Sequence, residues 1–294
     1  MSAAHLAEAR YQKAVALMKK FPPLPPLGNI ATQLLSAMGA RRATTTTLAH
    51  IIEKDVALAA NVQKVANSPF YGQSRNIATI DRAVVLLGID VIRNVALASS
   101  VARVFRGGRL TPDFHINTLW RHSLAVAALT DALAKTLAPA HREHAFTVGL
   151  LHDVGFLVEL SLWPLEFVSF VRKLESEKMS PQDLLRFEVE LFGASHDDFG
   201  RVLLEQWLLP HDFCRATAAH HRLGASGGED TLAALVLLAD ELSATIGAPL
   251  LLDARDPAAK AAALATLRAD WQTLAPMATH LLPQIEALTG NLGS

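Results

Sequence analysis

The sequence predicts an all-α protein, and two observations support this fold class. Apolar residues recur at helical spacing throughout the 294 residues, whereas sustained alternation of apolar and polar residues with hairpin dipeptides is not found. Hydrophobic residues make up 51% and charged residues 19%, so the chain can bury a core, and disorder is excluded as its main state. A chain of this length forms one large domain or two ordinary ones.

Helices in the basic first part of the sequence are bounded by prolines, glycines and capping residues. The FPPLPPLG segment ends the first helix because proline lacks the amide hydrogen that a helix interior requires. Asp55 caps a helix that ends before Pro69, Thr79 or Asp81 begins another, and Gly88 interrupts it. The expected helices cover residues 4–20, 27–40, 48–53, 56–66, 79–87 and 90–106.

Helical segments continue through the rest of the sequence. Pro181 stands at the first turn of one of them, a position that tolerates proline. Ser195 and Asp198 resemble a capping box at the start of another. The expected helices cover residues 117–137, 143–160, a segment from 181 onward, 196–208, 211–221 and 231–246, with one or two packing helices within 256–288.

The net charge of −1 conceals a difference between the two parts of the chain. Residues 1–110 hold 14 Lys/Arg and 5 Asp/Glu, a balance of +9, whereas residues 111–294 hold 13 and 23, a balance of −10. This asymmetry indicates either two parts that attract each other or a basic part that meets an anionic partner. The arginines near residue 106 lack the interleaved aromatic residues that stack on bases, so a nucleic-acid partner is disfavoured.

Cysteine usage and apolar runs indicate the compartment. Cys214 is the single cysteine and has no partner for an internal disulfide, which fits a reducing compartment. The apolar run 232–239 is far shorter than the roughly 20 residues that span a bilayer. The first ten residues lack the apolar segment of a secretory signal. We therefore expect a soluble, cytoplasmic protein without a membrane span.

Histidines are concentrated in one third of the sequence. Nine of the twelve lie between His115 and His221. His122 shares a helical stripe with apolar residues four, seven and eleven positions later, which predicts that it points inward. His152 and Asp153 stand together in the apolar segment GLLHDVG, where we expect them in mid-helix. Neighbouring helical residues diverge by about 100°, so two adjacent polar groups can address one centre from different sides.

Asp240 lies within the apolar segment LVLLADEL. A buried carboxylate is costly unless it is paired, hydrogen-bonded or bound to a cation. Imidazole nitrogen and carboxylate oxygen together suit iron, manganese or zinc, and the lack of thiolates argues against a structural zinc cage. The alternative is that each inward histidine simply donates to a backbone carbonyl, which is the commoner situation for a lone buried histidine.

Several motifs together resemble a known family. His…His-Asp…Asp in this order, with GLLHDVG around the pair, resembles the HD superfamily of metal-dependent phosphohydrolases. The strings KFPPLPPL, IIEKDVALAANVQKVANSPFYG, AVVLLG, LWRHSLAVA, AFTVGLLHDVG, FGASHDDFGRVLLEQWLLP and AAHH resemble the HDOD family over residues 20–245.

The resemblance implies a two-lobed helical bundle with an HD-like C-terminal lobe. The glycine pair at 107–108 marks the expected boundary, giving a basic N-terminal lobe at 1–110, the HD-like lobe at 111–250 and C-terminal packing helices at 251–294. HDOD proteins are bacterial signalling modules that are generally regulatory, whereas the related HD-GYP phosphodiesterases hydrolyse cyclic di-GMP at an iron site. By motif position, the metal ligands would be His122, His152, Asp153, His196, one or both of His220 and His221, and Asp240.

The chain departs from the HD-GYP pattern at positions that serve catalysis. Phe156 stands where those enzymes carry a lysine, and an apolar ring there removes a cation from a site that must stabilise negative charge. The segment RLGASGGED contains no GYP motif, and Thr118 stands where three-metal members place a glutamate. An enzyme would need another cation turned into the pocket, for which Arg121 and Arg222 are the candidates.

Three further residues have non-catalytic interpretations. Glu188 and Glu190 are two positions apart in a helix and cannot act as a pair on one face, so Glu188 is either an internal polar partner or solvated. Cys214 lacks an obvious histidine–acid partner set, which disfavours a nucleophilic role.

The leading hypothesis from the sequence is a non-catalytic regulatory HDOD protein with a vestigial pocket that holds a metal or a ligand. Its cofactor would be a divalent transition metal, iron or manganese. Its partners would be a signalling protein acting in trans and a small anionic or nucleotide ligand. The alternative is a metal-dependent phosphodiesterase or phosphohydrolase that acts on a cyclic dinucleotide or another nucleotide. A weaker third possibility is a nucleic-acid or anion binder that uses the basic N-terminal part.

Overall fold

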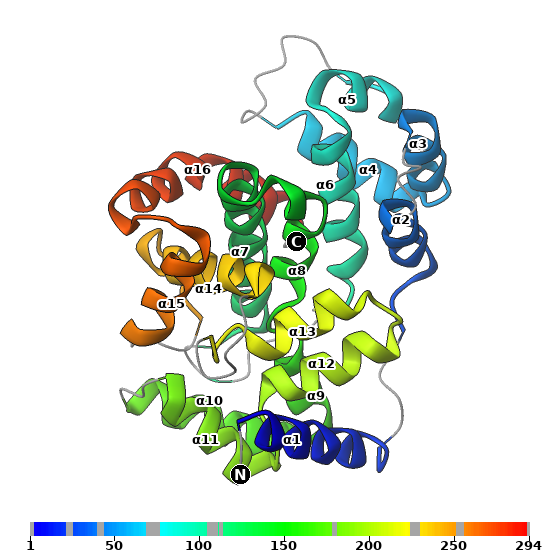
Figure 1. Ribbon diagram of the computed structural model, residues 1–294. Coiled ribbons are helices and arrows are strands. Elements are labelled where there is room, and N and C mark those ends of the chain that lie inside the picture. Colours follow the sequence, from blue (N-terminus) through cyan, green and yellow to red (C-terminus); the bar gives the residue numbers. More distant parts are fainter. Residues whose placement is uncertain are drawn as a thin grey trace. The chain divides into compact units, whose positions relative to one another are not determined.

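The protein is described by a computed structural model over residues 3–21, 26–39, 44–68, 77–104, 111, 114–177, 181–223, 230–250 and 256–292. Within these ranges the regular structure is helical and no strand occurs (Figure 1). The predicted all-α fold class is therefore confirmed.

The chain forms two compact units that do not follow chain order. One unit combines residues 1–25 with 107–279, and the other combines residues 26–106 with 280–294. The first helix, α1 (Ala3–Met18), therefore belongs to the same unit as the acidic part of the sequence. The predicted ranges 1–110, 111–250 and 251–294 stay a prediction.

Local signals account for the helices of the smaller unit. The carboxylate of Asp55 accepts the backbone N–H of Leu58, and the hydroxyl of Thr79 accepts that of Arg82, as the sequence predicted. Gly88 has a φ of 92°, a conformation that glycine adopts without strain, and it separates two helices. The helices are α2 (Asn29–Gly39), α3 (Thr45–Glu53), α4 (Val56–Ala66), α5 (Ile80–Leu87) and α6 (Ile89–Val101).

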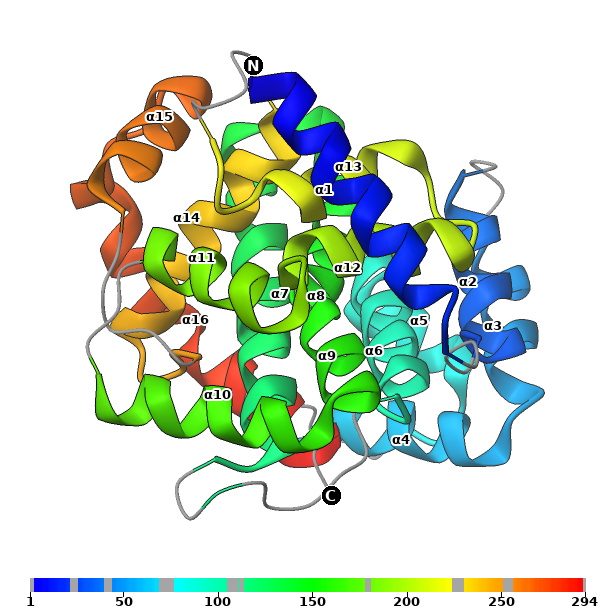
Figure 2. The ribbon, with the colours of Figure 1, turned by 90° about the horizontal axis from the view of Figure 1, so that it is seen from below.

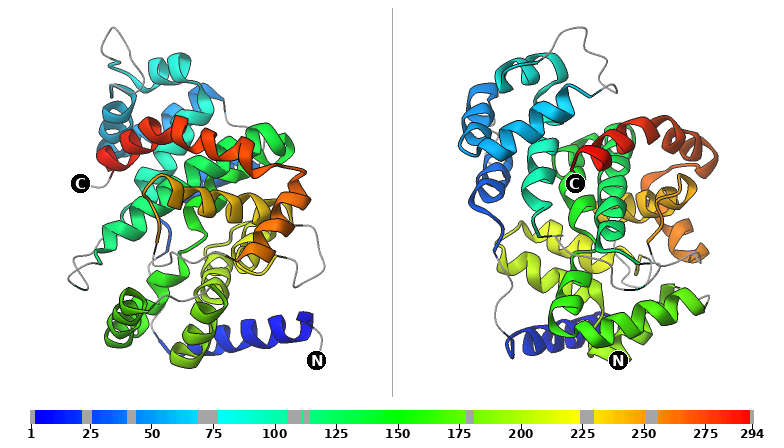
Figure 3. Two further views of the ribbon diagram at one scale, coloured as in Figure 1. Left: turned by 90° about the vertical axis from the view of Figure 1, so that its left-hand side faces the viewer. Right: turned by 180° about the vertical axis from the view of Figure 1, so that it is seen from behind.

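Three helices of the larger unit lie side by side and form its centre: α7 (Ile116–Leu137), α8 (Arg142–Leu151) and α14 (Thr231–Thr245) (Figures 1 and 3). Apolar side chains of all three helices are buried where the helices pack together. The surrounding helices are α9 (Gly155–Leu162), α10 (Pro164–Ser176), α11 (Pro181–Phe192), α12 (His196–Gln206), α13 (His211–Ala219), α15 (Pro257–Leu267) and the first part of α16 (Trp271–Leu292).

The predicted continuous helix over 143–160 is wrong. Helix α8 ends at Leu151, residues 152–154 form a turn, and α9 begins at Gly155. A Cβ atom on Gly155 would lie 1.7 Å from the carbonyl oxygen of His196, so the two backbones touch at this point. His152 and Asp153 consequently lie in a turn rather than in mid-helix.

The predicted capping box at Ser195 is also wrong. Ser195 precedes α12, but its side chain makes no capping bond to the helix backbone. Its hydroxyl lies 2.5 Å from Asp197 Oδ1 and 2.8 Å from Asp198 Oδ2. The free backbone N–H of His196 is instead satisfied by the Glu188 carboxylate, at 2.9 Å.

One segment of the described chain is long and apolar enough to cross a membrane by length and composition, although the sequence predicted no span. This segment, Pro139–Leu162, has a mean hydropathy of 1.5, and 83% of it is buried inside the protein. It comprises the short 3-10 helix η2 (Pro139–His141), α8 and α9, with a turn between the two α-helices. Its apolar composition is that of a core segment.

Candidate metal centre

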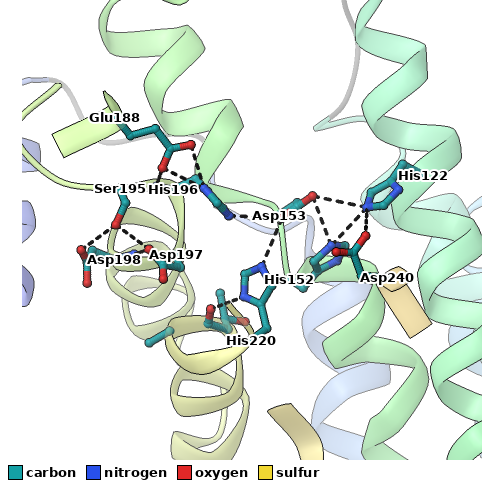
Figure 4. Close-up of polar contacts among 12 residues, drawn as sticks. His122, His152, Asp153, Glu188, Ser195, His196, Asp197, Asp198, His220 and Asp240 are labelled. Atoms are coloured by element: carbon teal, nitrogen blue, oxygen red, sulfur yellow. Dashed lines mark hydrogen bonds and ion pairs between the residues drawn. The ribbon is translucent and has the colours of Figure 1, made fainter. Parts of the chain in front are cut away.

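The structure brings all seven residues proposed from the sequence together within the larger unit, and Figure 4 labels all of them except His221. We call this set the His/Asp cluster. Its members come from α7, from the turn between α8 and α9, from the first position of α12, from the segment after α13 and from α14: His122, His152, Asp153, His196, His220, His221 and Asp240. Five segments that are distant in sequence therefore converge on one buried place.

The cluster divides into two groups. The donor atoms of His122, His152 and Asp240 all lie within 4.8 Å of one another. Those of the second group, which Asp153 forms with the histidines of α12 and of the segment after α13, satisfy the same limit. Each group offers imidazole nitrogen and carboxylate oxygen in a space that a metal ion can fill.

Asp153 stands between the two groups. Its Oδ2 atom lies 3.1 Å from Nε2 of His152 and 3.5 Å from Nε2 of His122. Its Oδ1 atom lies 3.5 Å from Nε2 of His196 and 3.5 Å from Nε2 of His220. One carboxylate thus presents an oxygen to each group, which is how a carboxylate bridges two cations (Figure 4).

Outer contacts fix the orientation of the imidazole rings. In three of them Nδ1 lies within hydrogen-bond distance of a backbone carbonyl oxygen: His122 with Ala248 (2.9 Å), His152 with Gly149 (2.8 Å) and His220 with Thr217 (2.6 Å). A carbonyl oxygen only accepts, so Nδ1 carries a proton and Nε2 is the nitrogen that faces the cluster. Histidines that bind metals are commonly held in this way.

His196 is oriented by a carboxylate instead. Its Nδ1 lies 2.9 Å from both carboxylate oxygens of Glu188, which is fully buried. Burial disfavours the charged imidazole, but the Glu188 carboxylate outweighs burial and raises the pKa of His196 to about 9. The prediction that Glu188 is an internal polar partner is confirmed, whereas the side chain of Glu190 is 67% exposed.

The inner atoms of the cluster fit a cation. Asp153 Oδ1, His196 Nε2 and His220 Nε2 are buried and have no hydrogen-bond partner among the described residues. Nε2 of His122 and Nε2 of His152 lie 3.3 Å apart, although both rings already carry a proton on Nδ1. Two lone pairs at this distance repel unless a further proton or a cation lies between them.

The charge state of Asp153 agrees with this environment. Burial alone would raise its pKa. The charge of His152 and the contacts of the imidazoles that face the carboxylate outweigh burial and hold the pKa of Asp153 well below its usual value. Asp153 is therefore an anion at neutral pH, as a ligand carboxylate must be.

Comparison with known proteins identifies the family. The HDOD domain family matches residues 24–223, which is more than half of the chain. The chain belongs to the HDOD family. The resemblance seen in the sequence motifs is thereby confirmed.

Similar solved structures support the same fold for this HDOD protein. An HDOD domain protein of unknown function from Geobacter sulfurreducens has a TM-score of 0.82 at 24% identity and covers 97% of this chain and 98% of its own. A protein from Marinobacter aquaeolei VT8, assigned to signal transduction, has a TM-score of 0.80 at 24% identity, with 98% of this chain and 66% of its own covered. A protein from Shewanella amazonensis SB2B, assigned to the phosphohydrolases, has a TM-score of 0.74 at 21% identity over 95% of this chain and 98% of its own.

A curated relative is an uncharacterized protein of Treponema pallidum (strain Nichols). It is 23% identical over 211 residues, which is 71% of this chain. The chain spans about 40% of the length of that relative.

Phe156 covers one side of the His/Asp cluster. Its ring is 4% exposed and stacks on the imidazole of His196, with ring centroids 4.2 Å apart and an angle of 15° between the planes. Phe167 and Phe170 pack against its other edges. The position at which related enzymes carry a lysine is therefore part of the apolar core here.

Of the two cations proposed as substitutes for that lysine, one is exposed and the other is bonded to residues outside the cluster. Arg121 is exposed on α7. The guanidinium of Arg222 bonds Asp197 and donates to the Ser195 hydroxyl at 2.9 Å.

A buried carboxyl group was missed by the sequence analysis. Glu159 on α9 is fully buried, and neither of its carboxyl oxygens has a hydrogen-bond partner among the described residues. Burial raises the pKa of Glu159 well above its usual value, and the nearby acids Glu188, Asp197 and Asp153 raise it further. The signal was present in the sequence as one acid in the apolar run FLVEL.

The single cysteine is inert. Cys214 is 1% exposed, and burial raises the pKa of its thiol to about 11. The fraction of thiolate at neutral pH is therefore very small, in agreement with the prediction that it is not a nucleophile.

Proposed function

We propose that this HDOD protein is a regulatory, non-catalytic module whose His/Asp cluster holds a divalent transition metal, iron or manganese. The observation that carries the proposal is the ring of Phe156, which stacks on His196 at the position where related hydrolases carry a lysine. Every position expected to hold a metal ligand carries His or Asp, whereas position 156, where a lysine would contact phosphate, carries an apolar ring.

The residues that would hold the metal are the two groups of the cluster, with Asp153 facing both. Neutral imidazole Nε2 atoms and carboxylates suit iron, manganese and zinc. When bound, such ions supply positive charge and lower the pKa of a coordinated water to about 7. The residues of this chain orient the rings through Nδ1, keep Asp153 ionised and exclude solvent from the centre.

Burial supports a role without turnover. His122, His152 and His220 are at most 1% exposed, and Asp240, at 9%, is among the more open members. A phosphodiester must bring its phosphorus within a few ångströms of an activated water, and these side chains leave little surface for it. A buried centre of this kind would stabilise the lobe or serve to sense a bound metal or ligand.

The alternative proposal is a metal-dependent phosphodiesterase or phosphohydrolase acting on a cyclic dinucleotide. The observation in its favour is that Asp153 presents one oxygen to each group, an arrangement used by two-metal hydrolases. Without a lysine at position 156, another cation would have to stabilise the developing charge.

Elemental analysis combined with an activity assay separates the two proposals. Protein purified anaerobically should contain iron or manganese, and Asp153→Asn should lose most of it. The metal-loaded protein should hydrolyse a cyclic dinucleotide no faster than the Asp153→Asn variant. The control is Asp212→Asn, because the Asp212 side chain is 60% exposed and the metal content should not change.

Two results would contradict the proposal. Turnover by the parent protein that Asp153→Asn abolishes would establish the hydrolase instead. If protein from anaerobic, metal-supplemented preparations contained no metal, the proposal that the cluster holds a metal would be wrong.

We further propose that the protein signals through a protein partner in trans and works in the cytoplasm. The signal-transduction assignment of the similar Marinobacter aquaeolei VT8 protein supports the first part.

A further inference from the structure

A second site lies in the larger unit, apart from the His/Asp cluster. A solvent-open cavity of about 450 Å³ is lined by residues of α1, α12, α13 and the segment after α13, and by Asp230, the residue before α14. Helix α1 crosses α12 and α13 and forms one wall (Figure 2). None of the seven cluster residues lines this cavity.

Arginines dominate the charge of the cavity wall. Four of them line it together with two acids, Asp198 and Asp230, and three further acids, Asp197, Asp212 and Glu205, contact the same arginines. The four lie on α1, α12, α13 and the segment after α13: Arg10, Arg201, Arg215 and Arg222. Guanidinium groups stay charged at any physiological pH, and their fixed fork of N–H donors matches the geometry of phosphate and carboxylate anions.

Three of the four guanidinium groups contact an acid through Nε, the nitrogen nearest the side-chain stem. Three of the shortest contacts to an acid are made by Nε: Arg10 with Asp198 (3.3 Å), Arg201 with Glu205 (3.0 Å) and Arg215 with Asp230 (2.7 Å). A contact at Nε leaves the outer edge with its two terminal amino groups, and this edge binds phosphate or carboxylate in a bidentate manner. The outer edge of Arg222 is used by Asp197, Asp198 and Ser195, and one outer nitrogen of Arg215 lies 3.4 Å from the exposed Asp212, whereas the acid contact of Arg201 is made through Nε.

Stacking holds one arginine in place. The guanidinium carbon of Arg201 lies 3.8 Å from the centroid of the Tyr11 ring. The Tyr11 hydroxyl donates to Glu205 at 2.5 Å, and Glu205 also accepts from Arg201. A side chain fixed before binding loses less conformational entropy when a ligand arrives, which favours binding.

The rest of the wall consists of His211 and three alanines. Ala7 on α1 and the pair Ala218 and Ala219 on α13 line the same cavity. These methyl groups offer a surface for the organic part of a ligand, and the volume is in the range of small-molecule sites.

We propose that this cavity binds a small organic phosphate monoester. Such a group carries about −1.5 to −2 charges at pH 7 and three strong acceptor oxygens, which suit guanidinium donors. Its oxygens would face the outer edges of Arg201 and Arg215, and its organic part would contact the alanines. This inference stands independently of whether the metal cluster is catalytic.

Calorimetric titration of the full-length protein tests the site, with phenyl phosphate and inorganic phosphate as probes. Phenyl phosphate should bind more tightly than inorganic phosphate because only the ester reaches the apolar wall. The double variant Arg201→Gln, Arg215→Gln should weaken phenyl phosphate at least about tenfold, since two charge-assisted hydrogen-bond donors are lost. Arg201→Lys keeps the positive charge but removes the forked guanidinium group, so it should weaken phenyl phosphate binding less than the double variant does.

The matched control is Arg186→Gln on α11. The Arg186 side chain is 71% exposed and pairs with Asp183, so the same charge change should leave the affinity within about twofold. A melting curve identifies any variant that fails to fold, in which case the Arg201→Lys result decides.

Two outcomes would overturn the proposal. One is the absence of phenyl phosphate binding up to about 10 mM, a concentration well above a useful affinity. The other is binding that the double variant retains and a metal chelator abolishes, which would locate it at the His/Asp cluster.

Discussion

The Phe156 ring and the Glu188 carboxylate act on the same imidazole from different sides. Phe156 covers the face of His196, and Glu188 accepts the proton on its Nδ1. The ring is thus fixed in tautomer and orientation, with Nε2 towards Asp153. At the scale of single residues, these contacts support the proposal that the site holds a cation and does not clamp a phosphate.

Glu188→Gln tests how strongly this orientation supports metal binding. An amide keeps the shape of the side chain but removes the charge and presents one N–H group to His196. We expect metal affinity to fall about 10- to 100-fold while the fold is retained. Competition with a chromogenic chelator measures the change.

The matched variant is Glu190→Gln, two positions along the same helix. Because its side chain is 67% exposed, metal affinity should stay that of the parent protein. Equal losses in both variants would show that helix α11, rather than the Glu188 contact, is responsible.

Helices show where sequence reasoning succeeds and where it does not. Asp55 and Thr79 were identified as caps because a cap depends on the next three residues only. The break between α8 and α9 was missed because it depends on α12, which begins 41 positions after Gly155. The missing Cβ of Gly155 lets the two backbones touch and thereby brings Asp153 next to His196.

Gly155→Ala should separate α9 from α12. The new methyl group would lie 1.7 Å from the carbonyl oxygen and 2.5 Å from the carbonyl carbon of His196, and backbone cannot move aside cheaply. We expect a loss of at least about 1–3 kcal/mol in the free energy of unfolding, together with weaker metal binding. Denaturant unfolding measures the first and chelator competition the second.

Gly290→Ala is the control, because no neighbouring atom lies within 4 Å of a Cβ atom at that helical position. Alanine has the higher helix propensity, so stability should stay equal or rise slightly. If Gly155→Ala were equally harmless, the close approach of α9 and α12 would not determine the site.

At the scale of the whole molecule, buried acids govern how stability changes with pH. In the folded protein the pKa of Glu159 is raised well above 4.5, its ordinary value, by burial first and then by neighbouring acids. Between these two values the folded state binds more protons than the unfolded state. The free energy of unfolding therefore falls as pH rises through this interval.

Glu159→Gln should remove this dependence. A neutral amide has the same shape but does not ionise, so its burial costs no free energy of unfolding as the pH rises. The chelator-treated variant should therefore melt at a higher temperature than the chelator-treated parent protein. The gain should be larger at pH 8 than at pH 5, as measured by thermal unfolding in both buffers. The exposed Glu166→Gln on α10 should change neither value; an identical gain at both pH values would contradict the assignment.

Metal removal should lower the stability of the whole larger unit. The cluster joins five distant segments, and a ligand present at a hundred times its dissociation constant stabilises a protein by about 2.7 kcal/mol. We expect a chelator to lower Tm by roughly 5–10 °C in a protein of this size. The same treatment should leave the Tm of Asp153→Asn unchanged, and a shift in that variant would mean that the chelator acts elsewhere.

The sequence by itself determined the all-α class, the helix caps, the family and the residue types that could bind a metal. These properties depend on periodicity, on contacts within one turn and on motifs of adjacent residues. Tertiary structure decided that Asp153 faces both groups, that Phe156 covers His196 and that four arginines share one cavity. Such contacts join segments far apart in the chain, and their distances follow from helix packing, which local pattern does not encode.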